Sequence, residues 1–391
     1  MHQDFPETLL TGFECGHCGQ PAPADARVSV CTACGAPFLA RYDLDRARRE
    51  WPRGRGLWRW GELLPVPAAA RIELGAGDTP LVPTTLGETL GTGTTWIKDE
   101  AANPTGSFKA RGMAVAISRA AGLGAEALVV PSAGNAASAA SAYAATAGCA
   151  LHVFMPNDVP EPFRVETRAH AARLSLVDGL IDACGQRAAE GEKRYGWYNL
   201  ATFREPGRVE GKKTMGYELA QDFGGELPEV IIYPTGGGTG IVAMWKAFDE
   251  LEALGLIGPE RPRLIMVQAD GCAPLAEAFH ADEREGRVWP EGQTVADGMR
   301  VPKSLGGRLV LEAVRASGGE AVTVTDATMI EYARIMASET GIFPCPEGAA
   351  CLAAQDQLAA SGRIGPQERV VLFNTGTALK YTHLWPHQTG V

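Results

Sequence analysis

Residues 103–112 read NPTGSFKARG, and they follow an apolar run that is typical of a β-strand. Pro104 and Gly106 indicate a turn, and Ser107 is a good N-cap for a helix that continues beyond it. Lys109 would then lie in the first helical turn, where the helix dipole opposes a positive charge and helps to lower the pKa of an amine. Because only a neutral amine attacks a carbonyl carbon, we predict that Lys109 is the catalytic residue and forms a Schiff base.

Strand-like and helix-like segments alternate from about residue 94 onward. Such alternation is typical of parallel sheets with helices on both faces, in which ligands bind beyond the carboxyl ends of the strands. At 391 residues the chain is too long for one average core, so we expect an α/β protein with two domains and a small appendage. The predicted strands are residues 94–98, 127–131, 150–155, 174–177, 230–233, 264–268, 322–324 and 370–373. The predicted helices are residues 136–147, 212–223, 241–254 and 328–339.

The composition, with 45% hydrophobic and 21% charged residues, is that of an ordinary globular protein. The formal net charge of −10 repels a phosphate backbone, so we expect no nucleic-acid partner. The longest charge-free run, residues 127–157, consists mostly of Ala, Ser and Gly, so we predict neither a transmembrane helix nor a membrane partner. No basic region leads into an apolar one near the N-terminus, and we therefore expect a cytoplasmic protein.

Four of the nine cysteines form a CxxC…CxxC array within residues 13–42. Each CxxC can hold two thiolates on one turn, and four thiolates suit tetrahedral zinc. A redox pair would need only one CxxC, so we predict a structural zinc ribbon whose metal supplies much of its folding energy. The predicted ligands are Cys15, Cys18, Cys31 and Cys34.

Residues 46–60 mix six arginines with three tryptophans directly after this array. Basic residues interleaved with aromatic residues can bind nucleic acid. The alternative is a linker that is anchored by its tryptophans and whose arginines pair with an acidic protein body. The overall negative charge favours the linker.

Three further turns follow predicted strands and precede helices or the end of the chain. Residues 131–136 offer successive backbone N–H groups that suit a carboxylate, and Asn135 adds an amide that could hold a cofactor hydroxyl. Residues 233–240 contain a glycine loop that lets the backbone approach one small phosphate, although the spacing fits neither a Walker loop nor GxGxxG. Residues 373–378 place the hydroxyls of Thr375 and Thr377 at the end of the last strand, although the same residues also suit an ordinary turn at a strand end.

The order of the lysine turn, the asparagine turn, the glycine loop and the threonine turn resembles that of fold-type II pyridoxal-phosphate enzymes. The chain is most similar to threonine synthases and threonine-synthase-like proteins, and the similarity covers nearly its whole length. The motifs that carry this resemblance are the N-terminal cysteine ribbon and residues 56–65, 77–81, 103–112, 210–214, 346–350 and 374–376.

The resemblance implies two open, doubly wound α/β domains with the cofactor, pyridoxal 5′-phosphate, between them. The zinc-ribbon-like module would span residues 1–42, the large domain residues 43–100 and 203–391, and the inserted small domain residues 101–202. By the same resemblance Lys109 carries the cofactor, Asn135 bonds its phenolic oxygen and Thr375 faces its pyridine nitrogen. The remaining cofactor-binding residues would be Phe108, Gly236, Gly237, Gly238, Thr239 and Gly240.

The resemblance further implies a small amino-acid substrate and a homodimer. In threonine synthases, O-phospho-L-homoserine loses phosphate and water adds at Cβ, which requires a lysine that can move the Cα proton. Binding the leaving phosphate needs cations or many N–H donors. The candidate substrate-binding residues are Ser132, Ala133, Gly134, Arg208, Lys212 and Lys213, although residues 208–213 could equally be a solvated helix start.

Three positions depart from the threonine-synthase pattern. Ala110 stands where these enzymes usually carry an aspartate, and Ala133 and Ala136 stand where hydroxyl residues are common. The sequence SFKARG around Lys109 looks more like the serine and threonine ammonia-lyases of the same fold. We therefore keep two alternatives open. The first is an ammonia-lyase or β-replacement synthase that acts on another activated amino acid, and the second is a zinc-ribbon binding protein without catalysis.

Overall fold

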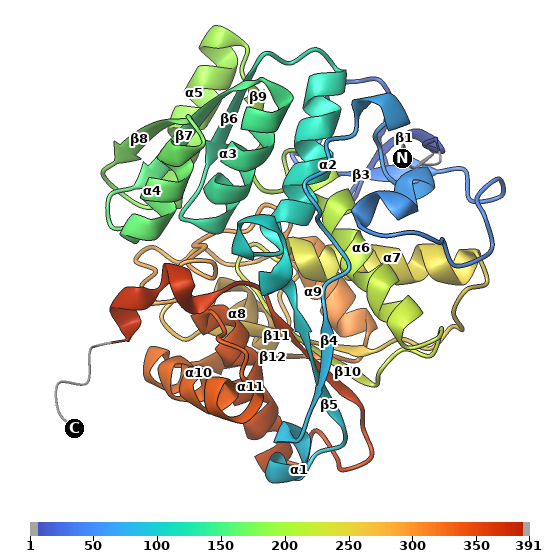
Figure 1. Cartoon of the computed structure of the whole chain (residues 1–391), viewed down its shortest axis with the longest axis vertical. Coiled ribbons are helices and arrows are strands. Elements are labelled where there is room, and N and C mark those ends of the chain that lie inside the picture. The colour runs from blue at the N-terminus through green and yellow to red at the C-terminus, as the bar shows by residue number, and fades with distance from the viewer. Residues whose placement is uncertain (1–6, 386–391) are drawn as a thin grey trace.

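Three β-sheets organise the computed structural model, which describes residues 7–385 (Figure 1). The smallest sheet is antiparallel and lies near the N-terminus. Its spatial order is β2 (Pro21–Pro23), β1 (Leu10–Cys15) and β3 (Phe38–Tyr42).

The largest sheet has six strands, and all but its edge strand β4 are parallel. Its spatial order is β12 (Glu320–Val324), β11 (Arg263–Ala269), β10 (Val230–Pro234), β13 (Val370–Asn374), β5 (Thr95–Asp99) and β4 (Leu81–Thr84). The four strands of the third sheet are all parallel. Its spatial order is β8 (Arg173–Val177), β7 (Ala150–Pro156), β6 (Ala127–Pro131) and β9 (Tyr198–Asn199).

The helices cover the two parallel sheets, and no helix within residues 7–385 has the length and apolar character needed to cross a bilayer. Three helices pack on the four-stranded sheet: α3 (Asn135–Ala147), α4 (Glu161–Ala169) and α5 (Ile181–Tyr195). The others are α1 (Leu86–Leu90), α2 (Lys109–Gly122), α6 (Gly207–Asp222), α7 (Thr239–Ala253), α8 (Pro274–His280), α9 (Gly307–Ala316), α10 (Asp326–Thr340) and α11 (Pro346–Ala360).

The six-stranded sheet is buried on both faces, as its apolar strands predict. Along β10, Ile231 and Tyr233 belong to the hydrophobic core shared with α7 and α9. Val230 and Ile232 belong to the core shared with α10 and α11 on the opposite face. The predicted α/β fold with parallel sheets is therefore confirmed, and each predicted strand is present to within two residues of its expected ends.

Helix α6 is the main difference from the helices expected, because it begins at Gly207 rather than at residue 212. Every residue from Gly207 to Ala220 is buried. The interpretation of residues 208–213 as a solvated helix start is therefore wrong. A helix that is buried all round carries no amphipathic pattern from which its start could be located.

The side chain of Arg111 connects α2 to α6 inside the protein. Its guanidinium donates to both carboxylate oxygens of Glu100, at 2.7 and 2.8 Å, and to both carboxylate oxygens of Glu218, at 2.7 Å each. The three side chains are at most 1% exposed. The helices meet closely at this point, since a Cβ atom on Gly211 would lie 2.0 Å from the carbonyl oxygen of Arg111.

The arginine- and tryptophan-rich segment is built into the protein body. Trp58 and Trp60 are at most 4% exposed, and the Trp60 ring lies 4.7 Å from the ring of Tyr217 on α6. Arg48 pairs with Glu62 at 2.6 Å. These contacts favour the interpretation of the segment as an anchored linker.

Replacing Arg111 with Met should strongly destabilise the fold, because Glu100 would be left buried without its cationic partner and Glu218 would keep only the more distant ammonium of Lys98, at 3.4 Å. Burial alone would raise the pKa of Glu218, but Arg111 lowers it to about 2. We expect the free energy of unfolding in urea to fall by about 3–5 kcal/mol. The control is Arg187→Met, which removes an exposed pair with Glu190 and should change the free energy by at most about 0.5 kcal/mol. Equal effects of the two substitutions would contradict this account.

Candidate active site

The lysine turn lies against the turn that follows β13. The N–H group of Phe108 donates to the carbonyl oxygen of Thr375 at 3.1 Å, and that of Thr377 donates to the carbonyl oxygen of Gly106 at 3.0 Å. Gly106 has φ +65°, and a Cβ atom there would lie 2.8 Å from the Thr377 side chain. Backbone contacts between two distant segments therefore place Lys109 beside Thr375.

The predicted capping role of Ser107 is wrong. Helix α2 begins at Lys109, its N-cap is Phe108, and no side chain caps it. Ser107 is instead held in an extended conformation by a β-bridge to Gly376, which pairs its backbone with the threonine turn rather than with the helix. Lys109 still occupies the first helical turn, as the sequence predicts.

Lys109 is partly buried and faces a cavity. Burial, followed by the positive charge of Arg208, lowers the pKa of Lys109 to about 8. A substantial fraction of this amine is therefore neutral near physiological pH, as nucleophilic attack requires. The predicted direction is correct, but burial rather than the helix dipole is the largest cause.

The asparagine turn connects β6 to α3. The hydroxyl oxygen of Ser132 accepts hydrogen bonds from the N–H groups of Gly134, at 3.1 Å, and Ala137, at 2.9 Å. Ser132 therefore stabilises the start of α3, which limits its freedom to bind a substrate. Among residues 7–385 we find no hydrogen-bond acceptor for the N–H groups of Ala133, Asn135 and Ala136. These three amides lie where the sequence predicts a carboxylate site.

The glycine loop between β10 and α7 is pressed against its neighbours. A Cβ atom on Gly236 would lie 2.3 Å from the carbonyl oxygen of Gly298, and one on Gly240 would lie 2.1 Å from the Tyr233 hydroxyl. Only glycine fits these positions, and the loop backbone consequently lines the cavity at the N-terminus of a 15-residue helix. Such a helix start is a favourable place for an anion.

Two adjoining cavities bring the predicted residues together. The larger has a volume of about 390 Å³ and is lined by Lys109, Asn135, Thr375, Arg208 and the whole glycine loop, together with Phe108. The smaller, of about 90 Å³, shares Lys109, Asn135 and Arg208 with it and adds the residues of the asparagine turn. Of the predicted cofactor- and substrate-binding residues, only Lys212 and Lys213 line neither cavity.

The cations on α6 have three different environments. Arg208 is 2% exposed, lines both cavities and donates to the carbonyl oxygen of Leu200 at 2.8 Å, while its Nε atom has no partner among the described residues. Lys212 donates to the carbonyl oxygen of Arg208 at 2.9 Å, and burial, then Arg208 and Lys109, lowers its pKa well below the usual range. Lys213 points into another buried cluster, where it pairs with Glu210 at 2.7 Å. Arg208 is the one of the three that faces the cavity.

Several cavity residues were missed by sequence reasoning. Asp297 lines the smaller cavity, and burial, together with the nearby Glu347, raises its pKa to about 8. Glu347 accepts hydrogen bonds from the Gly298 N–H group at 2.7 Å and from the Tyr381 hydroxyl at 2.8 Å. Asp297 lies in the long irregular connection between α8 and α9. The length of that connection was the available signal, because loops of this size are often functional.

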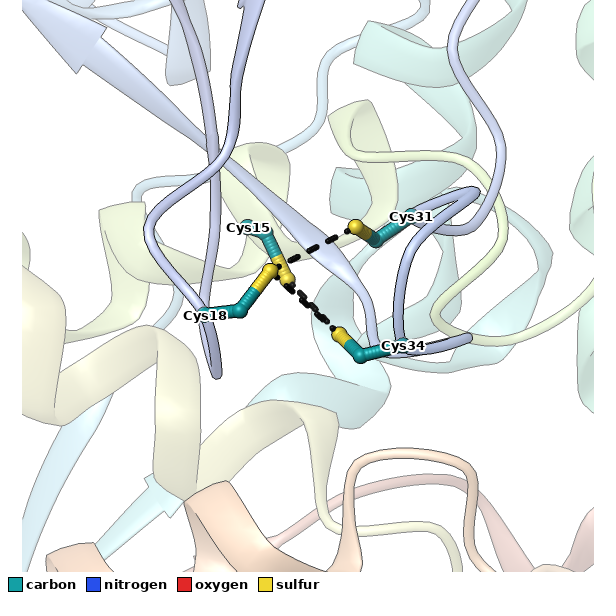
Figure 2. Close-up of side chains that lie close together, drawn as sticks. All are labelled: Cys15, Cys18, Cys31 and Cys34. Atoms are coloured by element: carbon teal, nitrogen blue, oxygen red, sulfur yellow. Dashed lines mark hydrogen bonds between the residues drawn. The ribbon is translucent and has the colours of Figure 1, made fainter.

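The four predicted zinc ligands lie close together in the N-terminal module (Figure 2). Their sulfur atoms all lie within 4.8 Å of one another, and three of the separations are 3.4, 3.5 and 3.6 Å. Tetrahedral zinc with Zn–S bonds of about 2.3 Å places sulfur atoms about 3.8 Å apart. The arrangement therefore fits a zinc ion.

The N-terminal module also contacts the rest of the protein. The hydroxyl of Tyr42, at the end of β3, donates to Glu210 on α6 at 2.8 Å. Arg27 donates to the carbonyl oxygen of Gly196, next to α5, at 3.1 Å. The module is thus attached both to the helix that carries Arg208 and to the layer that covers the four-stranded sheet.

Comparison with known proteins agrees with this geometry. Residues 72–376 match the family model described as "Pyridoxal-phosphate dependent enzyme". The threonine synthase of Methanocaldococcus jannaschii is 33% identical over 375 residues, which cover 94% of this chain and 92% of that protein. The threonine synthase of Methanosarcina acetivorans is 31% identical over 380 residues, with 94% and 92% covered. The processed form of threonine deaminase isoform 2 from Solanum lycopersicum has a similar fold, with a TM-score of 0.66 and 19% sequence identity. The superposition covers 88% of this chain and 97% of that chain.

The burial of Lys109 predicts that the difference in stability between wild type and Lys109→Met depends on pH. In the ligand-free protein below about pH 8, Lys109 is charged in both the folded and the unfolded states, and burying that charge costs stability. Between about pH 8 and 10.5 the unfolded chain holds more protons at this site, so wild-type stability rises with pH. We therefore expect ligand-free Lys109→Met to be more stable than wild type below pH 8 by about 1–3 kcal/mol.

This advantage should disappear as the pH rises to about 10.5, and urea denaturation at several pH values measures it. Lys193→Met, at an exposed position of α5, is the control for the loss of a lysine as such. A constant difference between Lys109→Met and wild type across this range would show that burial does not perturb Lys109.

Proposed function

Because the chain belongs to the pyridoxal-phosphate dependent enzyme family, we propose that it is a threonine synthase, a lyase that converts O-phospho-L-homoserine and water to L-threonine and phosphate. The observation that carries this proposal is the meeting of two features in one cavity. A lysine whose pKa is lowered to about 8 lines it, and so does a glycine loop at a helix N-terminus. The similarity to threonine synthases over 94% of the chain supports the choice of reaction.

The residues present fit pyridoxal phosphate. The backbone from Gly236 to Gly240 lines the cavity at a helix N-terminus, which suits the phosphate group, and a Cβ atom at Gly236 or Gly240 would displace this backbone by clashing with its neighbours. Lys109 is available for the covalent link, and Thr375, which is 5% exposed, offers a hydroxyl to the pyridine nitrogen. The cavity of about 390 Å³ is of the size that small-molecule sites usually have.

The bound cofactor supplies an electron sink that stabilises negative charge at the substrate Cα atom. The protein must then move protons at Cα and beyond, and Lys109 is placed to do so once the substrate has displaced it. Its lowered pKa lets the same amine accept a proton and return it near neutral pH. The buried walls around it, including Phe108 and Tyr233, limit access of water.

Two anion sites are proposed for the substrate. The N–H groups of Ala133, Asn135 and Ala136, which have no acceptor within residues 7–385, suit the α-carboxylate. Such backbone donors would let the site do without hydroxyl side chains at positions 133 and 136. The guanidinium of Arg208 suits the leaving phosphate, because Arg208 is buried, lines both cavities and has an Nε atom without a partner in the described part of the chain. Lys212 donates a hydrogen bond to the backbone carbonyl oxygen of Arg208 and so helps to hold Arg208 in place.

We propose the domain division expected from the sequence, with boundaries near residues 42, 100 and 202. It is supported by the composition of the sheets. The four-stranded sheet uses strands from residues 127–199 only, and the six-stranded sheet uses strands on both sides of that segment. A homodimer in the cytoplasm stays a prediction, and light scattering of the purified protein would measure the oligomeric state.

Product analysis of the purified, cofactor-loaded protein tests the proposed reaction. We expect equal amounts of phosphate and threonine from O-phospho-L-homoserine, and Arg208→Gln should raise the KM for this substrate by about tenfold or more. The control is Arg187→Gln on the exposed face of α5, which should leave KM unchanged. Release of ammonia and a keto acid from serine or threonine, without phosphate release, would instead identify an ammonia-lyase. Failure of the purified protein to bind pyridoxal phosphate would favour the non-enzymatic alternative, a zinc-ribbon binding protein.

We also propose that Cys15, Cys18, Cys31 and Cys34 bind one structural zinc ion, which the spacing of their sulfur atoms supports. Metal analysis should find about one zinc per chain, and Cys18→Ser should lower both the zinc content and the melting temperature. Cys149→Ser, at a cysteine outside the cluster, should leave the zinc content unchanged. A zinc content below about 0.1 equivalent per chain in the wild-type protein, with all four thiols freely alkylated, would contradict the zinc site.

A further inference from the structure

Lys380 links three separate parts of the structure around the cofactor site. It ends the short 3₁₀ helix Ala378–Lys380 that follows the threonine turn, and it is 8% exposed. Its ammonium contacts the carbonyl oxygen of Thr105 at 2.6 Å, Oδ1 of Asn135 at 3.2 Å and a carboxylate oxygen of Glu166 at 2.7 Å. These partners belong to the lysine turn, to the start of α3 and to α4.

The contact with Lys380 determines which way the Asn135 amide points. A lysine ammonium has N–H donors and no acceptor, so only the oxygen of the amide can face it favourably. The amide nitrogen must then point elsewhere, and Nδ2 of Asn135 lies on the side of Gly376, 3.4 Å from where a Cβ atom of that glycine would be. Asn135 thus presents an N–H donor beside the Thr375–Gly376 turn, in the cavity wall.

A donor is the group that the cofactor requires at this position. The phenolic oxygen of pyridoxal phosphate carries negative charge, so it is stabilised by N–H groups and repelled by an amide oxygen. An Asn135 side chain without a fixed neighbour could present either end of its amide. The reversed amide would place the side-chain oxygen of Asn135 against the phenolic oxygen of the cofactor, and a charge-assisted hydrogen bond would be lost.

We propose that Lys380 is a positioning residue of the cofactor site, which fixes the Asn135 amide with its N–H groups toward the phenolic oxygen of the cofactor. Lys380 acts through Asn135 and does not line either cavity itself. The hydrogen bond to the carbonyl oxygen of Thr105 holds the ammonium beside Asn135, and the ion pair with Glu166 attaches α4 to the same point. This inference rests on the proposed cofactor but not on the identity of the substrate.

A double-mutant cycle on cofactor affinity tests this role. The dissociation constant of pyridoxal phosphate is measured by absorbance titration for wild type, Lys380→Met, Asn135→Ala and the double variant. We expect Lys380→Met to weaken binding by about tenfold, because a charge-assisted hydrogen bond to the cofactor is lost or reversed. In the Asn135→Ala background the same substitution should weaken binding by less than about twofold, because its effect is transmitted by Asn135.

Two further variants separate positioning from structural support. Lys380→Arg keeps N–H donors at this point and should restore most of the affinity and the visible absorption band of the bound cofactor. Glu166→Gln removes the ion pair while leaving the Lys380–Asn135 contact, and it should retain an affinity within about threefold of wild type. If Lys380→Met does not fold, Lys380→Gln replaces it in the same cycle.

Independent effects of the Lys380 and Asn135 substitutions on the dissociation constant would overturn the proposal, as would an unchanged affinity in Lys380→Met. Loss of affinity in Glu166→Gln equal to that in Lys380→Met would also overturn it, because the ion pair rather than the amide orientation would then matter. A failure of phosphate release from O-phospho-L-homoserine, with the expected cycle intact, would overturn the proposed substrate and leave this role of Lys380 standing.

Discussion

The buried guanidinium of Arg111 is the constraint on which the site depends. It lies two residues after Lys109 on α2, and it is held by Glu100 from the segment after β5 and by Glu218 on α6. A charge buried to this degree requires all of its partners at hydrogen-bond distance, because each unpaired group would cost several kcal/mol. The network therefore fixes the start of α2 relative to the large sheet and to α6 at the same time.

The geometry of the cavity follows from this fixed helix start. Lys109 faces the glycine loop across the cavity, and α6, which is held by the same network, brings Arg208 close enough to lower the pKa of Lys109. On the other side, Lys380 attaches the lysine turn to Asn135 and to α4. Two cationic side chains, Arg111 and Lys380, thus fix the segment that carries Lys109 without lining the cavity themselves.

Sequence reasoning located the parts of the site that lie next to one another in the chain. The strands and the four turns at their ends were predictable, because apolar runs and small residues have local signatures. The roles of Ser107, Lys212 and Lys380 were not predictable, because each depends on a partner from a distant segment: Gly376, the carbonyl oxygen of Arg208 and Asn135, respectively. Asp297 was missed for a related reason, since its perturbation arises from burial and from Glu347.

The central claim is that Lys109, and no other lysine of this site, carries the cofactor. Lys212 is the critical rival, because it is buried nearby and its pKa is also lowered. The most direct measurement is borohydride reduction of the cofactor-loaded protein, followed by proteolysis and mass spectrometry of the labelled peptides. The account predicts one pyridoxyl group per chain, on Lys109. A label on Lys212 or Lys380, or no covalent label on a protein that binds the cofactor, would contradict it.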